Sequence, residues 1–527
     1  MSHGQWTKVE DLSPLLKTGR MVFRAASRQI LILKQGERFF AVNNRCPHEG
    51  YPLSEGQLSA DCTLTCNWHN WKFDLKSGET LVGGDRLRSY PLRWQEGDLY
   101  VDLSGPAPEE MQKKALDSLQ EAFYRYDYAR MGRELARFRK AGGEYSAAVA
   151  EVIRRTWDRF EYGMSHAFAA AADWLSLIRR YEAEDRPEAA LVAALECVSH
   201  FAWDSLRYGR FPYPEKVLPF EAEAFLQAVE EENEAEAVAR IRGAIGEGMT
   251  YAELRPVLAR AALAHYNDFG HAAIYVYKSG QLLAEIGEDS LDVVLLPLVR
   301  RLVYATREDL IPEFRAYGPA LAGWTVGQKT DLAPEEIQDM PVNRILTRVG
   351  GSGNSPAHLF SILFQVLVRN LLHFDVRLAA RTDNKVADNV DWLDFTHGLT
   401  FANAVRHLCR ETPDLWPAAL LQMACFAGRN MKYLDKTVSL EDWQVSDVTA
   451  FLRDFHEFLL NHGLPEPIIS CHYLKTLCAV EEERSAFPDA PWQAEALAAL
   501  KRFRAHPVRR KHSLRTARQA LDFTSRE

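Results

Sequence analysis

The sequence predicts a multidomain protein in which a small all-β domain precedes a large all-α domain. Up to residue 103, short apolar runs alternate with turn residues, a pattern typical of strands. From residue 109 onward, apolar residues recur with a helical period in long stretches rich in Ala, Leu, Glu and Arg. The chain has 527 residues, which is more than one domain usually holds.

The first domain is expected to span residues 1–104. Residues 29–33 and 39–43 are apolar and flank the polar residues 34–38, which indicates a hairpin, and residues 98–103 form a further candidate strand. Residues 105–108 contain two prolines, which end a strand, so we assign them to a linker.

The second domain is expected to span residues 109–527. An acidic pair after Pro108 suits the beginning of a helix, and Gly142 and Gly143 suit its end. The helical period then continues through residues 144–184, 187–210, 219–246, 251–286 and 289–305, with more after residue 356.

Composition excludes several classes of protein. Lys and Arg total 63 against 72 Asp and Glu, a net charge of −9, which argues against a nucleic-acid-binding protein. No run of about 18 apolar residues predicts a membrane span. The N-terminal residues lack the pattern of a secretory signal, and eight cysteines are too few for a disulfide scaffold, so we expect a cytoplasmic protein.

The strongest motif consists of Cys46, His48, Cys66 and His69. It reads Cys-x-His, seventeen residues, then Cys-x-x-His. Two thiolates can hold one iron of a [2Fe-2S] cluster and two imidazoles the other, which raises its reduction potential. Zinc also accepts two Cys and two His, but its usual sites place both Cys on one element and both His on another.

These residues resemble the two cluster-binding boxes of Rieske ferredoxins and Rieske oxygenases, over about residues 5–103. The resemblance implies that Cys46 and Cys66 hold one iron and that His48 and His69 hold the other. Neither box contains the additional cysteine of respiratory-chain Rieske proteins, and Cys62 lies outside that pattern. The resemblance therefore implies a ferredoxin-like cluster of lower potential.

A Rieske cluster moves one electron at a time, so the electron must go elsewhere. In ordinary Rieske oxygenases it goes to an iron held by an Asp-x₂-His-x₄-His arrangement. The nearest match here contains His265, Asp268 and His271, and both its order and its spacing differ. The helical domain is therefore not expected to be the catalytic domain of those oxygenases.

Four histidines lie in strongly apolar helical sequence, and imidazole suits iron, copper or zinc. They are His166, His271, His397 and His472. Lys475 shares a helix face with His472, and a buried lysine is unfavourable unless it is neutralised or modified. A single histidine in such sequence is more often hydrogen-bonded in the core than bound to a metal.

The sequence around these histidines is similar to the questin oxidase-like family of helical oxygenases, over about residues 110–490. The resemblance implies a non-haem iron held by His166, His271, His397 and His472 together with a ligand derived from Lys475. The chain departs from the family at Gly163 and Tyr275, where the family often has histidine. A diiron carboxylate centre is the alternative, but Glu196 and His200 are the nearest approach to its motif.

We therefore expect an O₂-dependent oxidoreductase, either a mono- or a dioxygenase, in which the cluster delivers electrons to a histidine-bound metal. The aromatic and leucine content favours an apolar or aromatic small molecule as the substrate. No flavin or nicotinamide fingerprint is present, so an external ferredoxin or flavoprotein reductase must supply electrons. The alternative is an electron-transfer protein whose helical domain binds a partner. The chain could form a homo-oligomer, and the acid-base residues of catalysis stay unknown.

Overall fold

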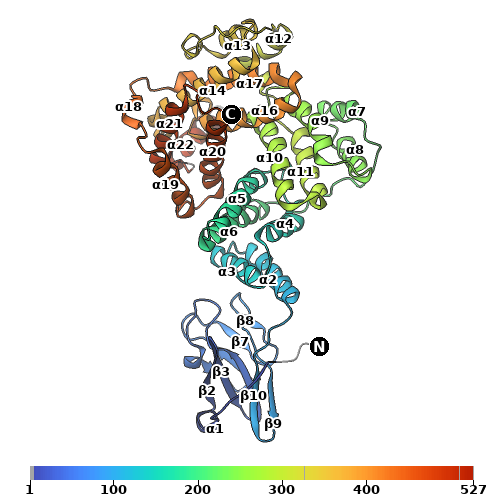
Figure 1. The fold of residues 1–527 in the computed structure, drawn as a ribbon, viewed down its shortest axis with the longest axis vertical. Helices are drawn as coiled ribbons and strands as arrows, with labels where there is room; N and C mark the ends of the chain where they lie inside the picture. The colour runs from blue at the N-terminus through green and yellow to red at the C-terminus, as the bar shows by residue number, and fades with distance from the viewer. Residues whose placement is uncertain (1–4, 326, 510, 526–527) are drawn as a thin grey trace. The chain divides into compact units, whose positions relative to one another are not determined.

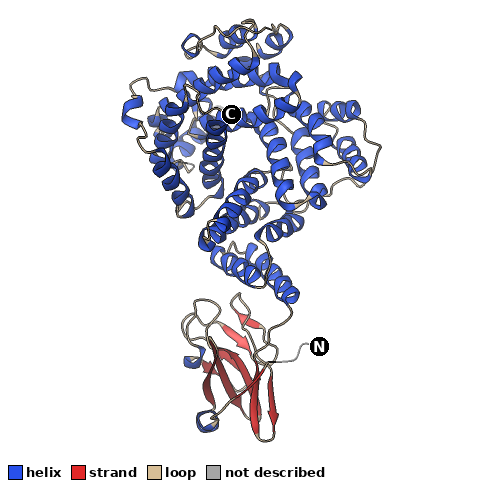
Figure 2. Ribbon diagram, viewed as in Figure 1, coloured by secondary structure: helices blue, strands red, loops and turns tan. Residues whose placement is uncertain are grey.

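The computed structural model describes residues 5–325, 327–509 and 511–525. A small region of strands is followed by a large helical region, as Figures 1 and 2 show, and this confirms the predicted fold class. The chain divides into two compact units, residues 1–144 and 145–527.

The first unit contains three antiparallel sheets, with strand orders β1-β10-β9, β2-β3-β4 and β5-β6-β7-β8. A short helix, α1 (Ser13–Thr18), follows β1. The strands are β1 (Trp6–Lys8), β2 (Arg20–Ala25), β3 (Arg28–Gln35), β4 (Arg38–Asn43), β5 (Gln57–Leu58), β6 (Thr63–Thr65), β7 (Lys72–Asp74), β8 (Thr80–Val82), β9 (Leu92–Gln95) and β10 (Asp98–Asp102).

The predicted hairpin is confirmed as β3 and β4, which pair antiparallel around Gly36. Strand β3 is buried on both faces. Leu31 and Leu33 belong to a core that also contains the cysteines of the predicted cluster, whereas Ile30 and Ile32 belong to a second core against β10. A strand with two buried faces reads as a continuous apolar run, as residues 30–33 do.

The secondary structure changes within the predicted linker, because β10 ends at Asp102 and α2 (Pro108–Phe123) begins at Pro108. Helix α2 and helix α3 (Tyr128–Lys140) nevertheless belong to the first compact unit. Asp85 is completely buried and accepts hydrogen bonds from Arg133 and Arg137 of α3. The independent folding of residues 1–104 stays a prediction.

The second unit is helical. Its helices are α4 (Tyr145–Thr156), α5 (His166–Ala183), α6 (Pro187–Ser205), α7 (Ala222–Glu230), α8 (Glu234–Gly246), α9 (Tyr251–Leu263), α10 (His271–Ile286), α11 (Leu291–Val303), α12 (Tyr317–Ala322), α13 (Val342–Gly350), α14 (Pro356–His373), α15 (Val376–Ala380), α16 (Leu393–Glu411), α17 (Trp416–Asn430), α18 (Leu440–Trp443), α19 (Val448–Leu460), α20 (Pro467–Ala486), α21 (Gln493–Ala505) and α22 (Ser513–Thr524). No helix among the described residues is long and apolar enough to cross a bilayer.

Four helices of the second unit form a closed ring, because α5 packs against α10, α10 against α16, α16 against α20, and α20 against α5. Each is rich in buried apolar residues. We call these four helices the four-helix ring.

Candidate functional site

The cluster motif lies on two loops with matching backbone geometry. The backbone N–H of Cys46 donates to the carbonyl oxygen of Tyr51, and the N–H of Cys66 donates to that of Trp71, both at 2.8 Å. The residues four positions after each cysteine, Gly50 and Asn70, both have positive φ, +80° and +59°. Each loop thus turns back tightly and presents its cysteine and histidine on one side.

The two loops bring all four predicted ligands together. Cys46 and Cys66 are buried side by side, and burial is the main reason why the pKa of Cys46 is raised to about 11. The Nδ1 atoms of His48 and His69 lie 3.2 Å apart. Both Nε2 atoms lie on the side of Glu49, within 3.9 Å of its carboxylate. Inward Nδ1 atoms and paired thiols suit mixed ligation of a [2Fe-2S] cluster.

Two tryptophans flank His69 in sequence, and both stack on neighbouring rings. Trp71 lies against His48, with ring centroids 4.6 Å apart and an interplanar angle of 15°. Trp68 stacks on Tyr51 at 4.1 Å and remains 60% exposed. Trp71 therefore covers a candidate ligand, whereas Trp68 presents an aromatic surface to solvent.

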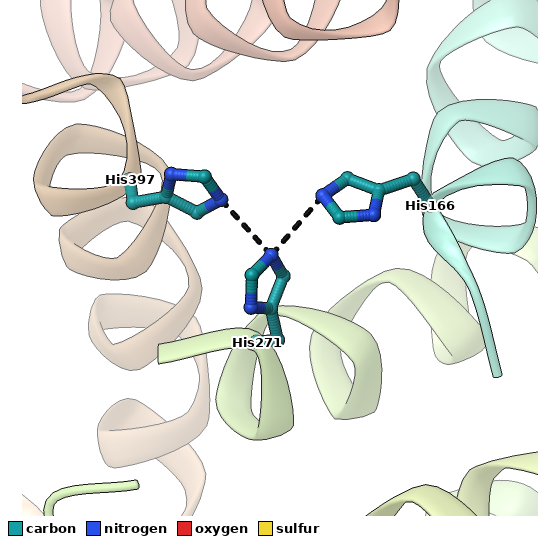
Figure 3. Close-up of side chains that lie close together, drawn as sticks. All are labelled: His166, His271 and His397. Carbon is teal, nitrogen blue, oxygen red and sulfur yellow. Dashed lines mark hydrogen bonds between the residues drawn. The ribbon is translucent and has the colours of Figure 1, made fainter. Parts of the chain in front are cut away.

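The four candidate histidines of the second unit lie one on each helix of the four-helix ring. Their Nε2 atoms approach one another in series: His166 to His271 at 3.1 Å, His271 to His397 at 2.9 Å, and His397 to His472 at 3.4 Å. Figure 3 shows the first three converging from separate helices. Ligand atoms of those three all lie within 4.8 Å of one another, and the His472 ring lies 5.0 Å from that of His166.

In three of the four histidines, a hydrogen bond to a backbone carbonyl group determines which ring nitrogen carries the proton. Nδ1 of His271 lies 2.6 Å from the carbonyl oxygen of Asp268, and those of His397 and His472 each lie 2.5 Å from a carbonyl oxygen one turn earlier. A carbonyl oxygen only accepts, so each Nδ1 carries the proton and each Nε2 presents a lone pair. Three lone pairs facing one another repel unless a cation lies among them.

Protons cannot supply that positive charge at neutral pH. Burial, reinforced by neighbouring positive charge and by the other histidines, lowers the pKa of His166, His271 and His472 well below 6.5. The rings are therefore neutral, which is the form that binds metals. A metal ion fits this donor set, and hydrogen bonds at Nδ1 are the usual way in which proteins orient metal-binding histidines.

Lys475 is completely buried one turn after His472, and its Nζ has no hydrogen-bond partner among the described residues. Burial lowers its pKa. The nearby charges that act on it include Asp173 and Lys278, and its own charge acts on His166 and His472. A buried amine without a partner is unfavourable unless it binds something else.

A strained turn places His271. Asp268, Phe269 and Gly270 all have positive φ, between +47° and +79°, and form the 3₁₀ turn before α10. The carboxylate of Asp268 pairs with Arg301 and not with the histidines, whereas its carbonyl oxygen contacts His271. Strain of this kind persists at sites where it fixes a functional group.

The structure accounts for both departures from the family pattern. Gly163 has a φ of +84°, and a Cβ there would lie 2.2 Å from the carbonyl oxygen of Pro297, so histidine would not fit. Tyr275 places its hydroxyl 3.3 Å from Nδ1 of His166. It therefore contacts the one candidate ring for which no backbone carbonyl contact is described.

Two other histidines considered from sequence lie outside this group. His265 contacts the carboxylates of Glu230 and Asp309. His200 lies beside Asp204, and Glu196 bonds instead to His462 and Ser470. The sequence analysis missed two polar residues further along the four-helix ring, Asp173 and Lys278. Each follows a candidate ligand, His166 or His271, by seven residues, and this shared spacing was visible in the sequence.

The comparisons with known proteins concern the first unit. Residues 5–91 match the model of the Rieske [2Fe-2S] domain. The 3-phenylpropionate/cinnamic acid dioxygenase ferredoxin subunit of Escherichia coli K12 is 37% identical over 81 residues, which is 15% of this chain and 76% of the relative. The corresponding subunit of Shigella boydii is 36% identical over the same shares.

Two solved structures match a part of the chain. The ferredoxin of carbazole 1,9a-dioxygenase from Nocardioides aromaticivorans is 20% identical and covers 19% of this chain and 98% of its own, with a TM-score of 0.18. A complex of oxygenase and ferredoxin of carbazole 1,9a-dioxygenase matches at 27% identity over 19% of this chain and 94% of that chain, with a TM-score of 0.17.

Proposed function

Because the chain belongs, through residues 5–91, to the proteins that carry a Rieske [2Fe-2S] domain, we propose that it is an O₂-dependent oxidoreductase with two metal centres. The cluster receives electrons from an external ferredoxin or flavoprotein reductase. His166, His271, His397 and His472 would hold a non-haem iron in the four-helix ring, which would supply the O₂-dependent oxidation of an aromatic or other apolar small molecule. The reaction inserts either one or both oxygen atoms of O₂ into the substrate.

The observation that carries this proposal is the convergence of histidine lone pairs in the helical unit. His271, His397 and His472 each direct a proton-free Nε2 toward the same small volume, and burial keeps His271 and His472 neutral. A structural core has no need of such an arrangement, because each ring could be replaced by an apolar side chain without leaving facing lone pairs. A metal ion removes the repulsion.

The side chains of both units have distinct roles in this proposal. Cys46, Cys66, His48 and His69 hold the cluster, and the stacked ring of Trp71 limits the access of water to it. A bound iron in the helical unit would supply one-electron chemistry with O₂. There, backbone carbonyl groups hold three of the imidazoles in one tautomer.

Lys475 supports a lysine-derived ligand, as the resemblance to questin oxidase-like proteins implies. Burial lowers its pKa and so favours the neutral amine, which is nucleophilic. Attack of that amine on CO₂ forms an N–C bond and releases one proton to solvent, which converts a neutral amine without a hydrogen-bond partner among the described residues into a carbamate anion. The anion would add a negatively charged oxygen donor to four neutral imidazoles.

The substrate class is also a proposal. The similar ferredoxin subunits are named for dioxygenases of 3-phenylpropionate and cinnamic acid. Both compounds contain aromatic rings. We therefore favour an aromatic substrate, and we propose that this chain joins in one polypeptide an electron carrier and an oxygenase.

Metal analysis of anaerobically purified protein tests the proposal. We expect three irons per chain, two in the cluster and one in the helical unit. Substitution of His271 or His397 by alanine should reduce the content to two irons and leave the EPR signal of the reduced cluster unchanged. Lys475→Ala should weaken retention of the third iron, and supply of CO₂ to apo-protein should increase iron uptake only when Lys475 is present.

The second candidate is an electron-transfer protein whose helical unit binds a partner. It is favoured by the fact that the similar curated proteins are ferredoxin subunits. Two irons per chain, full electron transfer to an acceptor and unchanged metal content in every histidine variant would support it and contradict the oxygenase.

A further inference from the structure

A column of polar groups runs along the four-helix ring, away from the four histidines. In α5 and α10 the residues seven positions after His166 and His271 are Asp173 and Lys278, and they form an ion pair of 2.7 Å. Because the histidines meet and the residues seven positions later also meet, α5 and α10 run in the same direction. At 1.5 Å per residue, this pair lies roughly 10 Å along the helices from the histidines.

Lys475 lies between these two layers. It comes three residues after His472, about 4.5 Å along α20. Two buried polar atoms here have no hydrogen-bond partner among the described residues, Nζ of Lys475 and Oδ2 of Asp173. Both side chains are at least 95% buried. The inner end of the column therefore has an acceptor oxygen available, about two helical turns from the candidate metal site.

The column continues outward from Lys278. Its ammonium donates at 2.7 Å to Oε1 of Gln281, whose amide donates at 2.8 Å to the hydroxyl of Tyr277. That hydroxyl donates at 3.1 Å to Glu482. Nζ of Lys278 also lies 5.1 Å from the ring centroid of Tyr277. The Gln281 amide does not relay a proton, so this step requires the Lys278 side chain to swing toward the Tyr277 hydroxyl.

The outer end of the column reaches solvent at His407 and Glu482. They follow His397 and His472 by ten residues each, and their side chains are 31% and 33% exposed, with Nε2 3.4 Å from the carboxylate. The imidazole also stacks on Tyr277 at 4.5 Å and contacts Arg406. Imidazole is the side chain best suited to exchanging protons with water near neutral pH.

We propose that this column supplies protons to the helical metal site, with entry at His407 and Glu482 and with Oδ2 of Asp173 as the inner acceptor. The inference rests on the proposed function. Incorporation of oxygen from O₂ with two electrons from the Rieske cluster consumes two protons: hydroxylation yields one C–OH and one water, and dihydroxylation yields a diol. An external reductase supplies the electrons, and bulk water supplies the protons through the column.

The charges along the column suit this role. Burial raises the pKa of Asp173 although Lys278 and Lys475 oppose the rise, so the carboxylate takes a proton more readily than an exposed one would. Burial alone would lower the pKa of Lys278, but the negative charges of Asp173 and Glu482 outweigh the effect of burial and raise this pKa. Glu482 stays ionised, because His407, Lys278 and Asn403 lower its pKa to about 2 despite burial.

The role of the Asp173–Lys278 ion pair is tested by an equilibrium measurement on the double variant Asp173→Asn/Lys278→Met. This variant removes both charges of the pair together, so neither charge is left buried without its partner. The reduction potential of the helical iron is measured anaerobically between pH 6 and pH 9. In the unmodified protein we expect the potential to fall with rising pH, because each electron is matched by a proton. The double variant should retain three irons and show a flattened dependence.

The outer end of the column is tested by measuring the rate of O₂ consumption of the His407→Ala variant. O₂ consumption should slow by at least about tenfold, the solvent deuterium isotope effect should increase, and added imidazole should restore the rate. The equilibrium dependence of the potential on pH should not change. His512→Ala is the control, because His512 lies outside the four-helix ring and contacts a backbone carbonyl group of Arg509 near the surface, so its loss should change neither readout.

The outcomes separate this inference from the proposed function. Two irons per chain in the unmodified protein would overturn both. Three irons with an unchanged pH dependence in the double variant, or an unchanged rate and isotope effect in His407→Ala, would overturn the proton route alone. Loss of the third iron from a folded double variant would overturn it as well, because the pair would then be part of the metal site.

Discussion

Tyr275 lies behind His166, one of the four candidate ligands of the helical unit. Its hydroxyl lies 3.3 Å from Nδ1 of His166, whereas the other three candidate rings contact backbone carbonyls. A hydroxyl is a weaker anchor, and removing a hydrogen-bond partner behind a metal-binding histidine usually lowers metal affinity about 10–100-fold.

We therefore expect Tyr275→Phe to lower the affinity of the helical unit for iron by about tenfold or more, without loss of fold. Tyr181→Phe is the matched control, since Tyr181 is buried on the same helix as His166 and its hydroxyl has no partner among the described residues. Competition with a chelator measures both variants. Equal iron retention in the two would show that Tyr275 does not orient His166.

Cysteine substitutions in the first unit have a built-in control. Cys46, Cys62 and Cys66 belong to one buried core, but only Cys46 and Cys66 lie on the two matching loops. Cys66→Ser should abolish the red-brown colour and the reduced EPR signal with the low average g value of mixed His/Cys ligation. Cys62→Ser should keep both, and a colourless Cys62→Ser protein would place this cysteine among the ligands.

At the scale of elements, α2 and α3 contribute a pair of cations to the β-sheet region. Arg133 and Arg137 approach Asp85 at 2.7 and 2.6 Å. Although burial opposes ionisation, the two guanidinium groups hold the pKa of Asp85 below its usual value. A fragment that ends near residue 104 loses both cations and the helix that carries them, and with them the two ion pairs of this carboxylate.

We therefore expect residues 1–144 to be more stable than residues 1–104, both with the cluster bound. The folded pKa of Asp85 is depressed, so its contribution is present above the unfolded pKa of about 3.9 and is lost as the pH falls through the folded value. The difference in unfolding free energy should thus be largest near neutral pH and shrink toward pH 3. Equal denaturation midpoints at pH 7 would contradict the role of α3.

At the scale of the whole helical unit, the buried histidines make stability depend on pH when metal is removed. Their folded pKa values are depressed, so below about pH 6.5 the unfolded chain binds protons that the folded chain does not. The stability of chelated protein should fall as the pH is lowered from 7 to 5.

Thermal unfolding of the chelated protein across that range measures the effect. His472→Phe removes one member of the group and should flatten the curve, whereas His512→Phe, outside the four-helix ring, should leave it unchanged. A curve for chelated protein that is level between pH 7 and pH 5 would mean that the rings are not kept neutral by burial.

The sequence by itself determined the features that depend on neighbouring residues. Candidate cluster ligands could be named because both loops are local and because thiol and imidazole alternate at fixed spacing, and their ligand role stays a prediction. The order of a β region and a helical region followed from periodicity, and the hairpin at residues 34–38 followed from turn residues. The candidate ligands of the second metal came from a family resemblance, since their periodicity equally fits a histidine buried in a core.

Only the tertiary structure decided which distant side chains meet. The histidines are separated by 75 to 126 residues, and their proximity depends on how four helices pack and on a strained turn at Asp268–Gly270. Tertiary packing likewise decided that Asp85 pairs with arginines of α3 and that Lys475 lies between the histidines and the Asp173–Lys278 ion pair. Periodicity gives the buried face of a helix, whereas its direction and register against its neighbours depend on side-chain packing across the whole unit.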